Sequence, residues 1–173
     1  MSRPRILIAG VGNIFLGDDA FGVEVVRRLA PRPLPDGVRV VDFGIRGIDL
    51  TYALLDGYDA VILVDAVPRG GRPGTLYVLE PHGGEAADPG PGPLIEPHSL
   101  TPAKVLRLAT ALGGQVPRLL LVGCEPAPLS EADEMQSELS PAVRAAVDEA
   151  VPLIESLVGL VLRGETLAGA EVR

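Results

Sequence analysis

The chain has 173 residues, of which 47% are hydrophobic and only 3% aromatic, and its formal net charge is −8. A chain of this length suits a single domain that buries roughly 70% of its unfolded surface. The negative charge disfavours a polyanionic partner, so nucleic acid is not expected. Cys124 is the one cysteine, which excludes a disulfide framework and a thiolate metal cluster.

The first residues, MSRPRILIAG, contain a short apolar run. A run of about five residues is too short for a signal peptide or a membrane-spanning helix. We therefore expect a cytoplasmic protein with no membrane partner.

Apolar runs bounded by glycine or aspartate alternate with segments of helical period in the first part of the chain. The pattern predicts, in order, a strand over 5–10, a helix over 19–30, a strand over 38–42, a helix over 48–55 and a strand over 60–67. The last of these runs is apolar almost throughout, which is typical of a central strand covered by helices on both faces.

The next predicted strand covers residues 75–79, and only PRGGRPG separates it from the run before. A parallel crossover needs a dozen or more residues, so this strand is expected to run antiparallel. Residues 81–97 are rich in Gly and Pro and predict a long surface loop.

The last part of the chain predicts two helices around one strand. Thr101-Pro102 opens a helix to about 112, a strand covers 117–123, and Ser140-Pro141 opens a helix to about 158. The tail 163–173 is expected to be frayed. These elements predict one three-layer α/β/α domain over 1–173, with a core of about 5–158. Its sheet would be twisted, about five-stranded and mostly parallel, with one antiparallel strand.

Aspartates stand where three of the predicted strands end: Asp18 and Asp19, Asp42, and Asp65. Ligands of open α/β sheets bind beyond the carboxyl ends of the strands, so these residues are candidates for a site. An ionised carboxylate is costly after an apolar run such as the one before Asp65, unless it has a partner. Of the adjacent pair, one aspartate could start a helix while the other holds a cation.

His98 directly precedes a predicted helix, which would fix its imidazole, whereas His82 is interpreted as a surface group at the start of the Gly/Pro loop. Two carboxylates and one histidine would suit a transition-metal ion with open coordination positions.

Two other kinds of site find little support in the sequence. Gly10 and Gly12 begin a dinucleotide-binding pattern, but Phe15 stands where its third glycine belongs. Cys124 has no histidine near it in sequence and is interpreted as a small apolar residue at a strand end. The nucleophile motif Gly-x-Ser-x-Gly is absent from the sequence.

The segment GVGNIFLGDDAFG, residues 10–22, resembles the N-terminal signature of the nickel–iron hydrogenase maturation proteases. Further stretches resemble the family in the same order along the chain: DFGIRG at 42–47, VDA at 64–66, PHSL at 97–100 and LVGCEP at 121–126. The resemblance extends over about 5–158.

This resemblance implies a hydrolase, an aspartic-type endopeptidase that removes a C-terminal extension from a hydrogenase large-subunit precursor after nickel insertion. The nickel would come with the precursor, and no resident organic cofactor is expected. The resemblance implies Asp19, Asp65 and His98 as metal ligands and catalytic residues, and Asp42 as a supporting residue. Asp19 stands where family members commonly have glutamate, and Asp18 would cap a helix.

The mechanism and the function each leave alternatives open. Nickel could polarise the scissile carbonyl or activate a water, with a carboxylate as general base. It could instead only position the substrate while Asp42 or Asp65 activates the water. The competing functions are a checkpoint that binds the nickel-loaded precursor without cutting it and a binding module for a nucleotide or metal.

Overall fold

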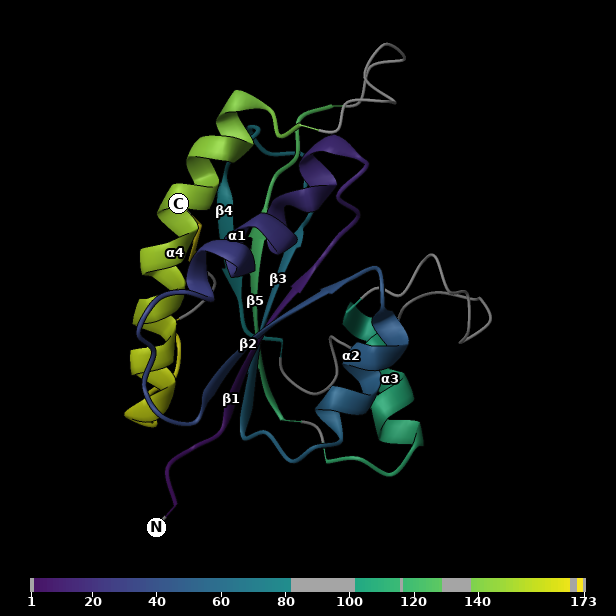
Figure 1. Ribbon diagram of the computed structural model, residues 1–173, viewed down its shortest axis with the longest axis vertical. Helices are drawn as coiled ribbons and strands as arrows, with labels where there is room; N and C mark the ends of the chain where they lie inside the picture. Colours follow the sequence, from purple (N-terminus) through teal and green to yellow (C-terminus); the bar gives the residue numbers. More distant parts are fainter. Residues whose placement is uncertain (1, 82–101, 116, 129–137, 169–170, 173) are drawn as a thin grey trace.

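The computed structural model describes residues 2–81, 102–115, 117–128, 138–168 and 171–172 (Figure 1). Its six-stranded sheet has the order β2-β1-β3-β5-β4-β6. The strands are β1 (Ile6–Val11), β2 (Val38–Gly44), β3 (Ala60–Ala66), β4 (Leu76–Leu79), β5 (Arg118–Cys124) and β6 (Glu171–Val172). The helices are the 3-10 turn η1 (Gly17–Ala20), then α1 (Phe21–Leu29), α2 (Gly47–Leu54), α3 (Pro102–Ala111) and α4 (Pro141–Leu162).

The strand directions confirm the predicted mixed sheet. β1 pairs in parallel with β2 and β3, and β3 pairs in parallel with β5. β4 runs antiparallel to β5, as the short PRGGRPG connection predicts. β6 was not predicted: its two residues pair with β4 inside the segment that was expected to be frayed. Helix α4 also runs to Leu162, past the predicted end near 158.

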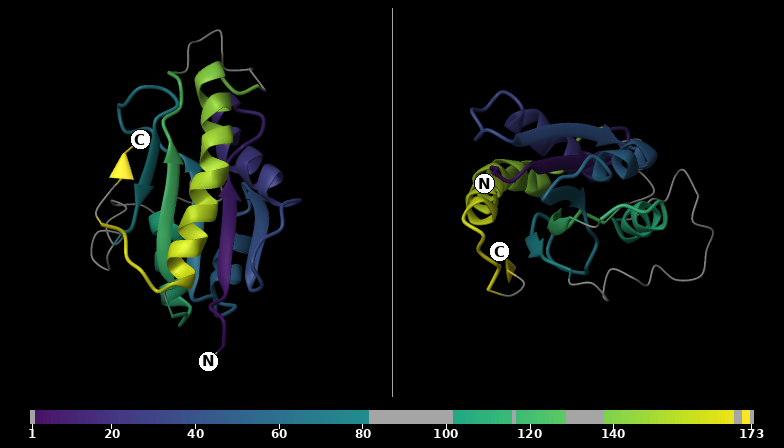
Figure 2. Two further views of the ribbon diagram at one scale, coloured as in Figure 1. Left: turned by 90° about the vertical axis from the view of Figure 1, so that its left-hand side faces the viewer. Right: turned by 90° about the horizontal axis from the view of Figure 1, so that it is seen from below.

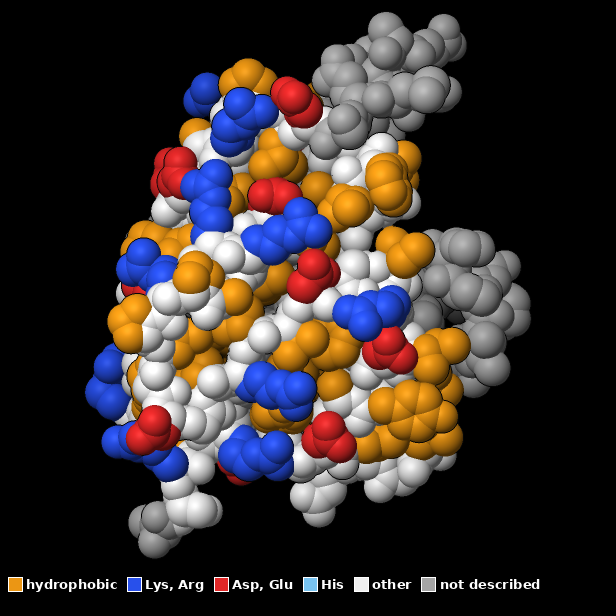
Figure 3. All heavy atoms as spheres, viewed as in Figure 1, with side chains coloured by type: hydrophobic (Ala, Val, Ile, Leu, Met, Phe, Trp, Pro, Cys, Tyr) orange, Lys and Arg blue, Asp and Glu red, His pale blue; other side chains and the backbone are white. Residues whose placement is uncertain are grey.

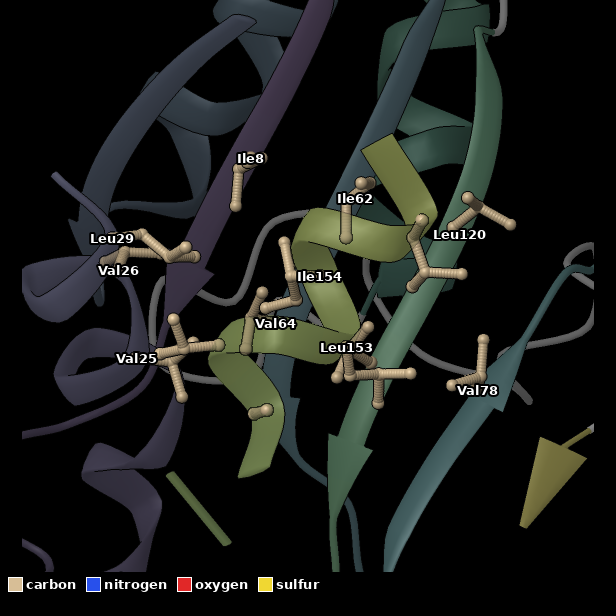
Figure 4. Packing of buried hydrophobic residues seen from close by; sticks show 14 of the residues in the cluster. Ile8, Val25, Val26, Leu29, Ile62, Val64, Val78, Leu120, Leu153 and Ile154 are labelled. Atoms are coloured by element: carbon tan, nitrogen blue, oxygen red, sulfur yellow. The ribbon is translucent and has the colours of Figure 1, made fainter. Parts of the chain in front are cut away.

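Helices cover both faces of the sheet, which makes the predicted three layers (Figures 1 and 2). On one face, α1 and α4 pack their apolar sides against β1, β3 and β5; Val25, Ile154, Ile62 and Leu120 meet there (Figure 4). On the other face, α2 packs against β1, β2 and β3, and α3 packs beside α2. Among the described residues, the buried polar side chains are few: Asp18, Thr51 and Glu125.

Glycines bring α1 very close to the sheet. A Cβ at Gly22 would lie 2.1 Å from the carbonyl oxygen of Val64, and one at Gly10 would lie 2.5 Å from the carbonyl oxygen of Gly22. Only glycine allows this approach of backbone to backbone. The start of α1, with η1 before it, is therefore held against the carboxyl ends of β1 and β3.

Candidate active site

The two adjacent aspartates of η1 point to different partners. Asp18 is buried, and its carboxylate accepts hydrogen bonds from Ala127 N–H at 2.8 Å, Ser140 N–H at 2.7 Å and Ser140 Oγ–H at 2.9 Å. Ser140 is the N-cap residue of α4, so the negative charge also lies at the positive end of that helix dipole.

The sequence predicted Asp18 as a cap of its own helix, and that prediction is wrong. Neither η1 nor α1 has a side-chain cap, and the carboxylate instead ties η1 to segments more than 100 residues away. The reason is position: Asp18 lies within the 3-10 turn, which is buried under the start of α4, so remote N–H groups are its nearest donors.

Asp19 is half-buried and faces the edge of the sheet. Its Oδ2 accepts a hydrogen bond from Asn13 N–H at 2.7 Å, which closes the turn between β1 and η1. Asp19 also lines a cavity beyond β3, and its negative charge acts on Asp65.

Asp65 is the second-last residue of β3. Burial, followed by the negative charge of Asp19, raises the pKa of Asp65 to about 8, although a hydrogen bond from the backbone N–H of Ala66 acts in the opposite direction. Asp19 thus lies near enough to Asp65 for its negative charge to act on that carboxyl group. A cation bound between two such carboxylates would relieve their repulsion and favour both ionised forms.

Asp42 faces another way. It follows Val38 and Val40, which pack on the α1 and α4 face, and its Oδ2 lies 3.7 Å from Nε of Arg27 on α1. Asp65 alternates with Val61 and Leu63, which pack on the opposite face. The structure therefore does not bring Asp42 together with Asp65, because the two side chains leave the sheet on different sides.

His98 and His82 lie outside the described residues. Within the ranges that the structure describes, no cluster of three or more His, Cys, Asp or Glu side chains could hold a metal ion. The described part of the predicted ligand set is the pair Asp19 and Asp65.

Cys124 is fully buried at the end of β5. Burial, and then the charges of Asp18 and Glu125, raise the pKa of its thiol to about 12. The thiol stays protonated at neutral pH, which supports its interpretation as an inert strand-end residue.

Sequence analysis missed Glu125, a buried carboxylate that follows β5. It accepts hydrogen bonds from Arg69 N–H at 2.8 Å, Gly70 N–H at 3.1 Å and Tyr77 Oη–H at 2.8 Å. Burial acts to raise the pKa of Glu125, but these hydrogen bonds outweigh it and lower the pKa. Glu125 thereby fixes the segment that follows β3. Its signal in the sequence was a carboxylate directly after an apolar strand.

A cavity of about 320 Å³ opens beside Asp19. Its walls come from η1, from the segments that follow β3 and β5, and from the start of α4. The lining residues are Leu16, Gly17, Asp18, Asp19, Ala66, Pro68, Pro126, Ala127, Pro128, Glu138 and Ser140.

Exposed hydrophobic side chains follow β1 and β2 at the same edge of the sheet. Phe15 is 72% exposed and Ile45 is 62% exposed, and Ile14, Leu16 and Ile48 are exposed beside them in the chain. Figure 3 shows hydrophobic surface over the loop after β1, on a face where acidic and basic side chains are otherwise interspersed. Exposed apolar residues near a site favour contact with another protein.

Comparison with known proteins gives the family. Residues 23–157 match the sequence profile of the family HycI, hydrogenase maturation protease. The chain belongs to the hydrogenase maturation protease family. The hydrogenase 2 maturation protease of Escherichia coli is 36% identical over 149 residues, which cover 85% of this chain and 86% of that protein. The hydrogenase expression/formation protein HoxM of Azotobacter vinelandii is 34% identical over 154 residues, or 86% of this chain and 73% of HoxM.

Solved structures of this protease family share the fold. The E. coli hydrogenase maturating endopeptidase HybD superposes with a TM-score of 0.70 at 30% identity, covering 97% of this chain and 96% of HybD. The hydrogenase 2 maturation peptidase of a Thaumarchaeota archaeon superposes with a TM-score of 0.63 at 35% identity, covering 90% and 99%. Family and fold together make this chain an endopeptidase. Among the described residues, none of the helices is long and apolar enough to span a membrane.

Proposed function

We propose that this maturation protease removes the C-terminal extension of a nickel–iron hydrogenase large-subunit precursor after nickel insertion, and that it recognises the nickel through Asp19, Asp65 and His98. The observation that carries the proposal is the position of Asp19 and Asp65 at the carboxyl end of β3, where the negative charge of Asp19 acts on Asp65. Two carboxylates held close together are destabilised without a cation, and the nickel of the precursor would supply it.

The chemistry of the ligand set fits a metal that arrives with its substrate. Carboxylate and imidazole groups bind divalent transition metals, and two or three ligands leave coordination positions for groups of the precursor. Binding of the metal would displace the proton that Asp65 retains at neutral pH. Nickel-free precursor lacks this interaction and would be held only by protein–protein contacts.

Hydrolysis also needs a group that accepts a proton from the attacking water. A general base works best when its pKa lies near the working pH. In the metal-free protein, burial has moved the pKa of Asp65 into that range. A bound nickel would replace the proton there, so Asp65 acts as the base only while its carboxylate is free of the metal. Asp42 is less suited to this role, because its carboxylate is paired with Arg27 on the other side of the sheet. Of the two strand-end aspartates, we therefore assign water activation to Asp65 and not to Asp42.

The protein substrate also needs a surface on which to dock. The exposed Phe15 and Ile45 flank the carboxyl ends of β1 and β2, beside the carboxylate pair. They provide apolar contact area for the body of the precursor while its C-terminal segment reaches Asp19 and Asp65.

The test is the intact mass of the precursor after incubation with the purified protease. The nickel-loaded precursor should lose a C-terminal peptide, and the nickel-free precursor should keep its full mass. If the nickel-loaded precursor binds and keeps its full mass, the protein is a checkpoint that does not cut.

A further inference from the structure

We propose that the cavity beside Asp19 is a specificity subsite, which takes the aliphatic side chain of a precursor residue flanking the scissile peptide bond. This inference rests on the proposed function. It specifies which side chain of the precursor the protease recognises, in addition to the nickel.

The position of the cavity is the first support. Asp19 lies in its wall, and Ala66 in the same wall directly follows Asp65. A peptide that binds beside Asp19, at the carboxyl end of β3, would therefore place a neighbouring side chain at the mouth of the cavity.

The chemistry of the walls selects the occupant. Most of the lining side chains are aliphatic, and Pro68, Pro126 and Pro128 have no backbone N–H to offer a ligand. The Asp18 carboxylate already accepts three hydrogen bonds from the walls themselves. An aliphatic side chain loses nothing by entering such a space, whereas an acidic one would be repelled by the carboxylates of Asp18, Asp19 and Glu138 in the walls.

The walls are also held in place before the substrate arrives. Asp18 joins η1 to Ala127 and Ser140, and Val67 N–H donates to the carbonyl of Cys124 at 2.9 Å, which joins the segments after β3 and β5. Glu125 fixes the backbone at Arg69 on the far side of Pro68. A pocket with fixed walls discriminates between side chains by their size, because it does not collapse around a smaller one.

The volume fits one aliphatic side chain with room to enter. A cavity of roughly 150 Å³ suffices for a benzene molecule, and this one measures about 320 Å³. It lies at the lower end of the range of ligand sites, which is roughly 300 to 1,000 Å³.

The experiment first enlarges a side chain that lines the cavity and then shortens the side chains that flank the cleavage site of the precursor. Ala127→Leu places a larger side chain in the wall, and Ala145→Leu makes the same change on the exposed side of α4, outside the lining. The substrates are the nickel-loaded precursor and two versions of it in which either residue flanking the cleavage site is replaced by alanine. The readout is kcat/KM from intact mass against time.

We expect Ala127→Leu to lower kcat/KM for the unaltered precursor by about 10- to 200-fold, the range for a misfit of one or a few methylene groups. One of the alanine-substituted precursors should recover most of this loss, so that the substrate preference of the wild type is inverted. Ala145→Leu should behave as the wild type. Leu16→Ala enlarges the cavity from an exposed position and should tolerate a bulkier flanking residue better than the wild type does.

Two outcomes would overturn the inference, and they are distinguishable. If the wild type cuts the precursor but Ala127→Leu and Leu16→Ala keep the wild-type order of preference, the subsite is wrong and the proposed function stands. If the wild type leaves the nickel-loaded precursor intact, the proposed function fails and the subsite with it.

Discussion

The carboxyl group of Asp65 should make the protein less stable as the pH rises. Its pKa is raised from 3.8 to about 8 in the folded state, so between these values the folded protein retains a proton that the unfolded chain has lost. Stability is then fully present below the unfolded pKa and falls as the pH rises towards the folded pKa. Asp65→Asn removes this titration and should flatten the dependence.

The size of the effect follows from linkage. One pKa unit corresponds to about 1.4 kcal/mol, so the upper limit between about pH 5 and about pH 8 is roughly 4 kcal/mol. Because Asp65 is only partly buried by its accessible surface, screening by water reduces the expected gain of the Asn variant at the higher pH to roughly 2 kcal/mol.

Urea denaturation of the metal-free protein at the two pH values measures the difference. Asp19→Asn should weaken the pH dependence without removing it, since burial and not the charge of Asp19 is the larger cause. Asp36→Asn is the control, because Asp36 is almost fully exposed and paired only with an exposed arginine. Equal stabilisation by Asp65→Asn at both pH values would refute the reasoning.

Four further predictions concern single positions. Asp18→Ala should lower the free energy of unfolding, measured by urea denaturation, by about 3 kcal/mol or more, since three hydrogen bonds to a carboxylate are lost. A much smaller loss would contradict the role given to these hydrogen bonds. Gly22→Ala should abolish stable folding, because its Cβ would clash with β3. Gly159→Ala in α4 should raise the free energy of unfolding by about 0.5–1 kcal/mol, and the melting temperature with it. Similar changes in melting temperature for both variants would contradict the close approach of α1 to the sheet at Gly22. Cys124 should resist alkylation by iodoacetamide at neutral pH until the protein unfolds, as mass spectrometry can follow. Asp42→Asn should process nickel-loaded precursor at close to the wild-type rate; a rate as low as that of Asp65→Asn would place Asp42 in the site.

The sequence predicted the layers and strand directions because their causes are local. The apolar run 60–67 and the short PRGGRPG connection each leave few arrangements open, and the structure confirms both. β6 could not be predicted, because two residues carry no periodicity and their pairing depends on the exposed edge of β4.

The sequence predicted that the candidate site lies at the carboxyl edge of the sheet, but it did not predict on which face of the sheet each side chain lies. Because both residues end predicted strands, Asp42 and Asp65 were equally good candidates for site residues. In the structure, side-chain alternation places them on opposite faces of the sheet, and the sequence does not indicate which helices cover each face. The role of Asp18 depends on Ser140, far along the chain, so no local pattern could indicate it.

The central claim is that Asp19 and Asp65 recognise the nickel of the precursor. Its most direct test is the Kd of the protease for nickel-loaded and nickel-free precursor, measured for the wild type, Asp19→Asn and Asp65→Asn. The account predicts that the wild type binds the nickel-loaded form at least about 10-fold more tightly, equivalent to about 1.4 kcal/mol, and that both variants lose this preference. A preference that survives in both variants would contradict it.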